Sequence, residues 1–265
     1  MPVATHLNAA VRGRVDGEVL VLLHGFGCGQ EMWRLVAPAL ERDHRVVTFD
    51  LPGSGAADPA AYDAVRHGSL EGYRDDVVAL LDELDLTGAT LVGHSVSSMI
   101  AVLVQAARPD LVSRLVLVAP SARYLDDDGY VGGFAEADIA DLLALMGRNH
   151  LGWQDPLARL VAGTDGDVKH ELEQSFCRTR PEVAEQFAAV TFRGDNRDDL
   201  AAVTVPTLVL QARDDVVAPM SAGRFVADTI PGATFEVIDT RGHCPHLTAP
   251  DETTRSIQRF LTTAG

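Results

Sequence analysis

The sequence predicts an α/β protein whose core is a doubly wound, mostly parallel sheet interrupted by a helical insertion. In the core, short apolar runs alternate with amphipathic stretches, as expected when parallel strands are covered by helices on both faces. From about residue 121 to 194 the strand-like runs disappear and helical periodicity takes over. We therefore expect a core formed by residues 1–120 and 195–265, with residues 121–194 inserted between two of its strands.

The strands expected in the core are apolar runs that end in turn residues. They cover residues 18–23, 45–49, 90–92, 115–118, 207–211 and 234–238. Helices are expected where apolar residues recur every three or four positions. In the core these stretches are 32–36, 73–84, 252–261 and the segment from 96 to the break at Pro109, and in the insertion they are 139–146, 153–161, 167–178 and 181–192.

Composition narrows the classes of function. A chain of 265 residues with 46% hydrophobic content can bury one large core. The formal charge of −16, from 38 acidic and 22 basic residues, argues against nucleic acid and anionic membranes as partners. No apolar run reaches the roughly 18 residues of a membrane span, and the N-terminus does not resemble a signal peptide. Three widely spaced cysteines, Cys28, Cys177 and Cys244, fit a reduced, cytoplasmic protein.

A strand–turn–helix pattern over residues 90–103 places Ser95 at the apex of a tight turn. In the G-x-S-x-G nucleophile elbow this context exposes the serine Oγ above the sheet and leaves the next N–H, here that of Val96, free for an oxyanion. The pattern here is G-x-S-x-S, because Ser97 occupies the last position. The alternative is that Ser95 only caps a helix.

The Gly-rich loop from His24 to Gly27 follows the first long strand. This is where the same architecture supplies a second oxyanion donor, and the N–H of Phe26 is the candidate. The alternative is an ordinary turn between a strand and a helix.

A serine hydroxyl needs a base and an orienting acid. His243 follows the last expected strand, and Asp214 and Asp215 follow the one before it. The order Ser, Asp, His at strand ends is that of a Ser–His–Asp triad in this type of sheet. His24, His94 and His246 are rival bases, but each lies beside a strand end with another expected role.

A serine nucleophile implies acyl transfer through a tetrahedral intermediate. Enzymes with this type of sheet that open carbon–halogen bonds or epoxides carry an aspartate in place of the elbow serine. Those reactions are therefore not expected here. The run His243-Cys244-Pro245-His246 has no second ligand pair at usable spacing, and we expect neither a metal nor a cofactor. We expect Cys28 and Cys244 to be buried thiols rather than reactive ones.

The chain resembles the α/β-hydrolases, and more narrowly the RsbQ-type bacterial regulators and the plant karrikin and strigolactone receptors. The segments that carry the resemblance are His24–Gln30 with Trp33, Gly93–Val96, Ser121–Leu125 with Tyr130–Phe134, Gln211–Pro219 and Arg241–Leu247. By this resemblance the acid is Asp215, four residues before Pro219.

The resemblance implies a four-helix, V-shaped lid over an apolar pocket, and hydrolysis of a small hydrophobic ester or lactone coupled to signalling. The alternative that it implies is a ligand receptor that activates a partner phosphatase or sensor protein in a stress-response pathway. The expected pocket residues are Phe26, His94, Val96, Phe134, Met146, Trp153 and Val190. Simple packing within the lid would also explain the aromatic residues.

Overall fold

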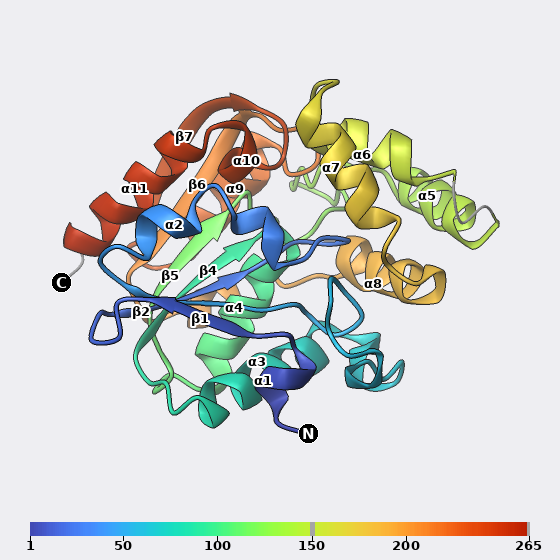
Figure 1. The fold of residues 1–265 in the computed structure, drawn as a ribbon. Helices are drawn as coiled ribbons and strands as arrows, with labels where there is room; N and C mark the ends of the chain where they lie inside the picture. The colour runs from blue at the N-terminus through green and yellow to red at the C-terminus, as the bar shows by residue number, and fades with distance from the viewer. Residues whose placement is uncertain (149–151, 264–265) are drawn as a thin grey trace.

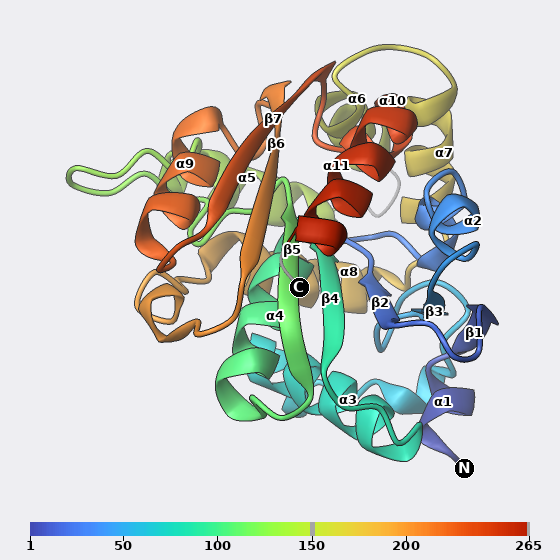
Figure 2. The same ribbon diagram turned by 90° about the vertical axis from the view of Figure 1, so that its left-hand side faces the viewer.

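The computed structural model describes residues 1–148 and 152–263, which form a seven-stranded sheet flanked by helices (Figures 1 and 2). The strand order is β1-β3-β2-β4-β5-β6-β7, and only β1 is antiparallel to its neighbour. The strands are β1 (Ala10–Gly13), β2 (Val19–Leu23), β3 (Arg45–Thr48), β4 (Ala89–His94), β5 (Val112–Val118), β6 (Thr207–Asp214) and β7 (Thr234–Arg241). The predicted doubly wound, mostly parallel sheet is confirmed.

Helices cover both faces of the sheet, because the buried strands are apolar on both sides. Leu20 and Leu22 of β2 face one cluster, while Val21 and Leu23 face the other, as the alternation of a strand requires. The first cluster includes residues of α2 (Ala37–Leu40) and α11 (Pro250–Thr263). The second includes residues of α3 (Leu70–Glu83), α4 (Val96–Ala107) and α9 (Met220–Thr229).

Several elements differ from the sequence prediction. Strand β1 and helix α9 were not expected; β1 has four residues and is largely exposed, so it lacks the apolar signal of a central strand. Residues 32–36 form no continuous helix but the end of a 3₁₀ turn, η1 (Gln30–Trp33), and the approach to α2. The remaining short elements are α1 (Val3–His6), η2 (Pro59–Ala61), η3 (Arg66–Gly68), η4 (Leu200–Ala202) and α10 (Pro245–Thr248).

Among the described residues, four α-helices lie between β5 and β6 in the chain and are grouped together, yellow-green to orange, in Figure 1. They are α5 (Glu136–Arg148), α6 (Gln154–Ala162), α7 (Asp167–Phe176) and α8 (Pro181–Arg193). Helix α6 packs on α7 and α5 packs on α8, so the group consists of two helix pairs. None of the helices in the described part of the chain is long and apolar enough to cross a bilayer.

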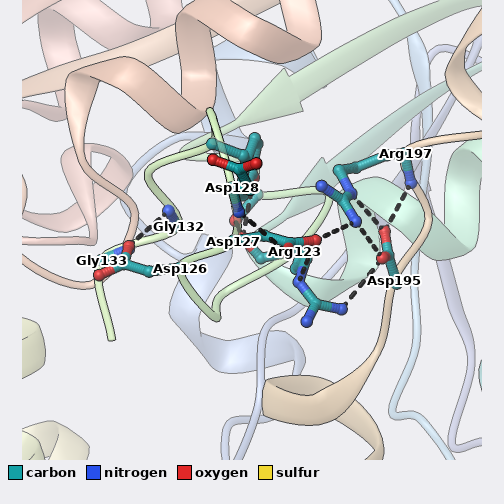
Figure 3. A network of polar contacts seen from close by, with 10 residues as sticks. Arg123, Asp126, Asp127, Asp128, Gly132, Gly133, Asp195 and Arg197 are labelled. Atoms are coloured by element: carbon teal, nitrogen blue, oxygen red, sulfur yellow. Dashed lines mark hydrogen bonds and ion pairs between the residues drawn. The ribbon is translucent and has the colours of Figure 1, made fainter. Parts of the chain in front are cut away.

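The chain enters and leaves this helical group through one ion-pair network (Figure 3). Arg123 on the entering segment lies 3.0 Å from Asp195 on the leaving segment. Arg197 pairs with both Asp195 and Asp127, at 2.7 and 2.8 Å. Asp126 accepts hydrogen bonds from the N–H groups of Gly132 and Gly133, which closes the loop that precedes α5. The segments before and after the four helices are therefore tied to each other.

Candidate active site

Ser95 stands on a strained turn between β4 and α4. Its φ of 57° and ψ of −126° lie in a region that residues other than glycine seldom adopt. Gly93 makes the turn possible, since a Cβ there would lie 2.4 Å from the carbonyl oxygen of Ser97. This geometry is that expected of a nucleophile elbow. A plain helix cap would not need it.

Ser97, which departs from the usual glycine, has its own hydrogen bond. Its hydroxyl donates to the carbonyl oxygen of His24 in the loop after β2. Its side chain is completely buried. Serine at this position therefore ties the elbow helix to the loop that carries the expected oxyanion donor Phe26.

His243 connects the hydroxyl to a carboxylate. Its Nε2 lies 2.8 Å from Ser95 Oγ, and its Nδ1 lies 2.7 Å from Asp215 Oδ2. All three side chains are buried, with between 3% and 6% of each residue exposed. The predicted residues thus come from three strand ends to one hydrogen-bonded chain, in which His243 can accept the serine proton and Asp215 can hold the Nδ1–H tautomer.

Asp215, and not Asp214, is the carboxylate in contact with His243. Asp215 Oδ1 accepts hydrogen bonds from the N–H groups of Val217 and Ala218, at 2.8 and 3.0 Å, which fixes the carboxylate in the turn after β6. Asp214 is exposed and lies 3.9 Å from Arg241. The structure therefore favours Asp215 over Asp214 as the partner of His243.

The other histidines near the site are occupied or shielded. His24 Nε2 accepts from the N–H of Leu51, and its Nδ1 donates to the carbonyl of Gly25. Burial lowers the pKa of His24, and burial together with neighbouring histidines lowers the pKa of His94 well below the usual value. Burial lowers the pKa of His246 to about 3. In the described part of the chain none of the three is hydrogen-bonded to Ser95 Oγ, as His243 is.

The two expected oxyanion donors, Phe26 and Val96, remain candidates, and the structure gives their positions. Val96 begins α4 directly after Ser95, and Phe26 follows β2. Within the described residues neither N–H has a hydrogen-bond partner. Gly27 lets helix α7 approach this loop, because a Cβ there would lie 2.5 Å from the ring of Phe176. Ser175 Oγ also donates to the carbonyl of Gly27.

Tyr124 is a functional candidate that the sequence analysis did not single out. Its hydroxyl lies 3.0 Å from Ser95 Oγ, and the residue is 2% exposed. Burial raises the pKa of this phenol, so it stays protonated at neutral pH. Its position in the segment after β5 was known from sequence, but no spacing rule connects that segment to the elbow.

A narrow cavity with a volume of about 20 Å³ lies above Ser95. It has room for roughly one or two water molecules. Two larger surface hollows in the described part of the chain are not lined by Ser95, Asp215 or His243. The cavity wall is mostly apolar, and aromatic rings surround Phe26 at centroid distances of 5.7 to 6.2 Å. The lining residues are Phe26, Cys28, His94, Ser95, Leu157, Val161, Phe176, Thr191, Phe192, Val217, His243 and Cys244.

Two of the seven expected pocket residues, Phe26 and His94, line this cavity. Val96 lies beside it through its backbone, and Trp153 packs behind Phe26 and Phe176. Phe134 packs edge-on against Phe192, and Met146 is buried in α5. Val190 lines a separate surface hollow next to the start of α3.

Helix α6 contacts the segment that carries His243. The backbone N–H of His243 donates to the carbonyl of Val161, at 2.7 Å. Gly242 has a φ of +92°, and a Cβ there would lie 2.3 Å from the carbonyl oxygen of Ala162. The position of the histidine therefore depends on the position of helix α6.

Serine hydrolases of this fold have a serine, a histidine and an aspartate hydrogen-bonded in that order at the carboxyl ends of the strands. The buried side chains of Ser95, His243 and Asp215 have this arrangement. The sequence profile of the Alpha/beta hydrolase family matches residues 20–255. The chain belongs to the alpha/beta hydrolase family.

Similar proteins extend over most of the chain. The "Strigolactone esterase D14" of Arabidopsis thaliana is 35% identical over 96% of each chain. The "Karrikin insensitive 2 receptor CA" of Petunia hybrida is 39% identical over 88% of each. The structure of a hydrolase from Oleispira antarctica superimposes with a TM-score of 0.96 at 37% identity, covering 98% of this chain and 96% of that one.

Proposed function

We propose that the protein hydrolyses small hydrophobic esters or lactones through an acyl-enzyme on Ser95. The hydrogen-bonded chain from Ser95 Oγ through His243 to Asp215 is the observation that carries the proposal. The apolar cavity lined by Phe26, Phe176 and Phe192 supports the choice of a hydrophobic acyl group or ring.

The geometry supports a two-stage reaction. Ser95 Oγ attacks the carbonyl carbon while His243 Nε2 takes its proton, and the N–H groups of Phe26 and Val96 hold the oxyanion. His243 then returns the proton to the leaving oxygen as the C–O bond breaks. Water, deprotonated by the same imidazole, attacks the acyl-enzyme and releases the acid. For a lactone the leaving alcohol remains attached to the acyl chain.

Residues 121–194 are proposed to act as a V-shaped lid on a core formed by the rest of the chain. The lid supplies Leu157, Val161, Phe176, Thr191 and Phe192 to the cavity wall. The cavity has room for little more than water. An ester or lactone can therefore enter only if α6, α7 or α8 moves outward.

The test compares wild type with Ser95→Ala on a chromogenic short-chain ester. We expect kcat to fall by about 10³-fold or more, since the nucleophile is lost while the oxyanion donors remain. Ser98→Ala is the matched control, because Ser98 is buried on the same helix and its hydroxyl donates to the carbonyl of Gly93, away from the reaction. Equal turnover by wild type and the Ser95 variant would reject the proposal.

A second function is supported by the contact between α6 and His243, and one of the similar proteins, that of Petunia hybrida, is named a receptor. We propose as the alternative that the protein acts as an RsbQ-like regulator, in which ligand turnover moves the lid so that a partner phosphatase or sensor protein recognises its outer surface. Substitutions of exposed lid residues such as Glu182 should then abolish partner binding in a pull-down and leave the esterase rate intact. Full partner binding by all such variants would exclude it.

A further inference from the structure

A second cluster of reactive side chains lies directly behind His243. His94 ends β4, and Cys244 and His246 flank the start of α10. One ligand atom from each of the three residues lies within 4.8 Å of the other two. Cys244 and His246 are fully buried and His94 is 2% exposed.

Three of the four ring nitrogens of this cluster have no hydrogen-bond partner in the described part of the chain. Neither nitrogen of His246 has a hydrogen bond, although the ring packs against Trp33 and His94 at centroid distances of 4.6 and 4.4 Å. His94 Nδ1 is also unpaired. Buried polar groups are normally bonded to protein, to water or to an ion, so unpaired nitrogens grouped around one thiol indicate a ligand.

The donor set selects the chemistry of that ligand. Both imidazoles are buried, and each has a ring nitrogen with no hydrogen-bond partner in the described part of the chain that can offer a lone pair to an ion. Two imidazole nitrogens and one sulfur suit a borderline-soft ion such as Zn²⁺, and they do not suit Mg²⁺ or Ca²⁺, which take oxygen ligands. The wide separation of these residues in the sequence, at positions 94, 244 and 246, hid the third ligand from motif analysis.

The geometry is close to that of a zinc site. With Zn–N and Zn–S bonds of about 2.0 to 2.3 Å, tetrahedral ligand atoms lie roughly 3.3 to 3.8 Å apart, so shifts on the order of 1 Å bring the three atoms into place. His94 Nε2 donates to the carbonyl oxygen of His243 at 2.8 Å. This bond fixes the tautomer that leaves Nδ1 with its lone pair, as outer-shell carbonyls do for zinc-bound histidines.

We propose that His94, Cys244 and His246 form a buried binding site for Zn²⁺ that is loaded through the active-site cavity. His94 and Cys244 line that cavity, which supplies the path of entry. The thiol of Cys244 loses its proton to solvent as the Zn–S bond forms, so each bound ion releases a proton and the affinity rises with pH. A water molecule completes the coordination.

Bound zinc would act on the neighbouring histidine. Cys244 and His246 lie one and three residues after His243 in the chain. His94 donates a hydrogen bond to the carbonyl oxygen of His243. Drawing these ligands together by about 1 Å displaces the imidazole from Ser95 by a similar amount, and misplacement on this scale costs on the order of 10²-fold in rate. This consequence for turnover rests on the proposed function, whereas zinc binding itself does not.

The binding test uses the full chain, reduced and stripped of metal with a chelator. Titration with Zn²⁺ in a calorimeter should show saturable binding of a single ion per chain, with heat that depends on the buffer because a proton is released. Co²⁺ in place of Zn²⁺ should give a thiolate charge-transfer band and the ligand-field bands of a tetrahedral ion. This spectrum needs no variant and reports ligation by a thiol directly.

Variants locate the site. Cys244→Ala and His246→Gln should each weaken Zn²⁺ binding by about 100-fold or more and abolish the Co²⁺ charge-transfer band or reduce it sharply. Cys28→Ala is the matched control, since Cys28 is buried and lines the same cavity but lies outside the cluster, and it should bind as wild type does. Circular dichroism verifies that each variant is folded.

The outcomes separate the two proposals. Zinc binding that survives both ligand variants, or the absence of a thiolate band with wild type, would overturn the zinc site whether or not the protein hydrolyses esters. Loss of binding in both variants but not in Cys28→Ala would support it even if no ester is turned over. Where esterase activity is present, added Zn²⁺ should inhibit wild type and Cys28→Ala, and His246→Gln should resist inhibition relative to its own metal-free rate.

Discussion

Gly242 is the position at which the coupling between helix α6 and His243 can be tested most sharply. The residue has a φ of +92°, and a Cβ would lie 2.3 Å from the carbonyl oxygen and 2.7 Å from the carbonyl carbon of Ala162. Both atoms are backbone, so Gly242→Ala must push α6 and the His243 segment apart by about 1 Å. The hydrogen bond from the His243 N–H to Val161, now 2.7 Å, should then be lost.

The expected cost follows from these contacts. A left-handed backbone costs an alanine about 1–2 kcal/mol, and the lost hydrogen bond about 1 kcal/mol more. We therefore expect the free energy of unfolding to fall by about 2–3 kcal/mol. A shift of the imidazole by about 1 Å should lower kcat by on the order of 10²-fold. Urea unfolding and turnover of a short-chain ester measure the two effects.

Gly232→Ala is the matched control for this prediction. Gly232 also has a positive φ, +71°, but an added Cβ would meet no atom within 4 Å. It precedes β7, whereas His243 follows it. The control should lose about 1–2 kcal/mol from backbone strain alone and keep its rate. If both variants lose the same stability and neither loses activity, the reasoning about the α6 contact is refuted.

Two further predictions concern charge. Asp215→Asn should lower kcat by about 10⁴-fold because the amide favours the wrong tautomer of His243, while Asp214→Asn, at an exposed site, should keep its rate; similar rates for both variants would contradict the assignment. The free energy of unfolding should fall as the pH is lowered, because burial lowers the pKa values of His24, His94 and His246. These histidines stay neutral in the folded chain but take up protons on unfolding below about pH 6.5. Each of these histidines should contribute roughly 1.4 kcal/mol per pH unit below 6.5, down to its folded pKa, which is about 3 for His246. Urea unfolding at pH 7 and pH 5 measures the slope, and equal stability at both would contradict neutral burial.

The sheet and the chain of contacts at Ser95 could be predicted because both leave local signals. A buried parallel strand is a continuous apolar run, and the residues that follow such strands meet at one edge of the sheet. The serine follows β4 and the acid follows β6, which are strands of this kind, whereas the histidine follows the edge strand β7, of which only Ile238 is buried. Strand β1 gave no such signal because its side chains are mostly exposed.

The cavity wall could not be predicted in the same way, because periodicity does not fix how a helix leans against the core. Val190 and Phe192 are two positions apart on α8, about 200° around the helix, so they face opposite sides. Phe192 lines the cavity and Val190 lines a separate hollow. Tyr124 approaches Ser95 from an irregular segment, for which no repeat distance exists.

The most direct test of the account is covalent labelling with a fluorophosphonate, a reagent that phosphonylates activated serines. We predict a single adduct in the intact mass, located on the peptide that contains Ser95, absent in Ser95→Ala and formed far more slowly in His243→Ala. An adduct on another residue, or equal labelling of wild type and Ser95→Ala, would contradict the assignment of Ser95 as the nucleophile.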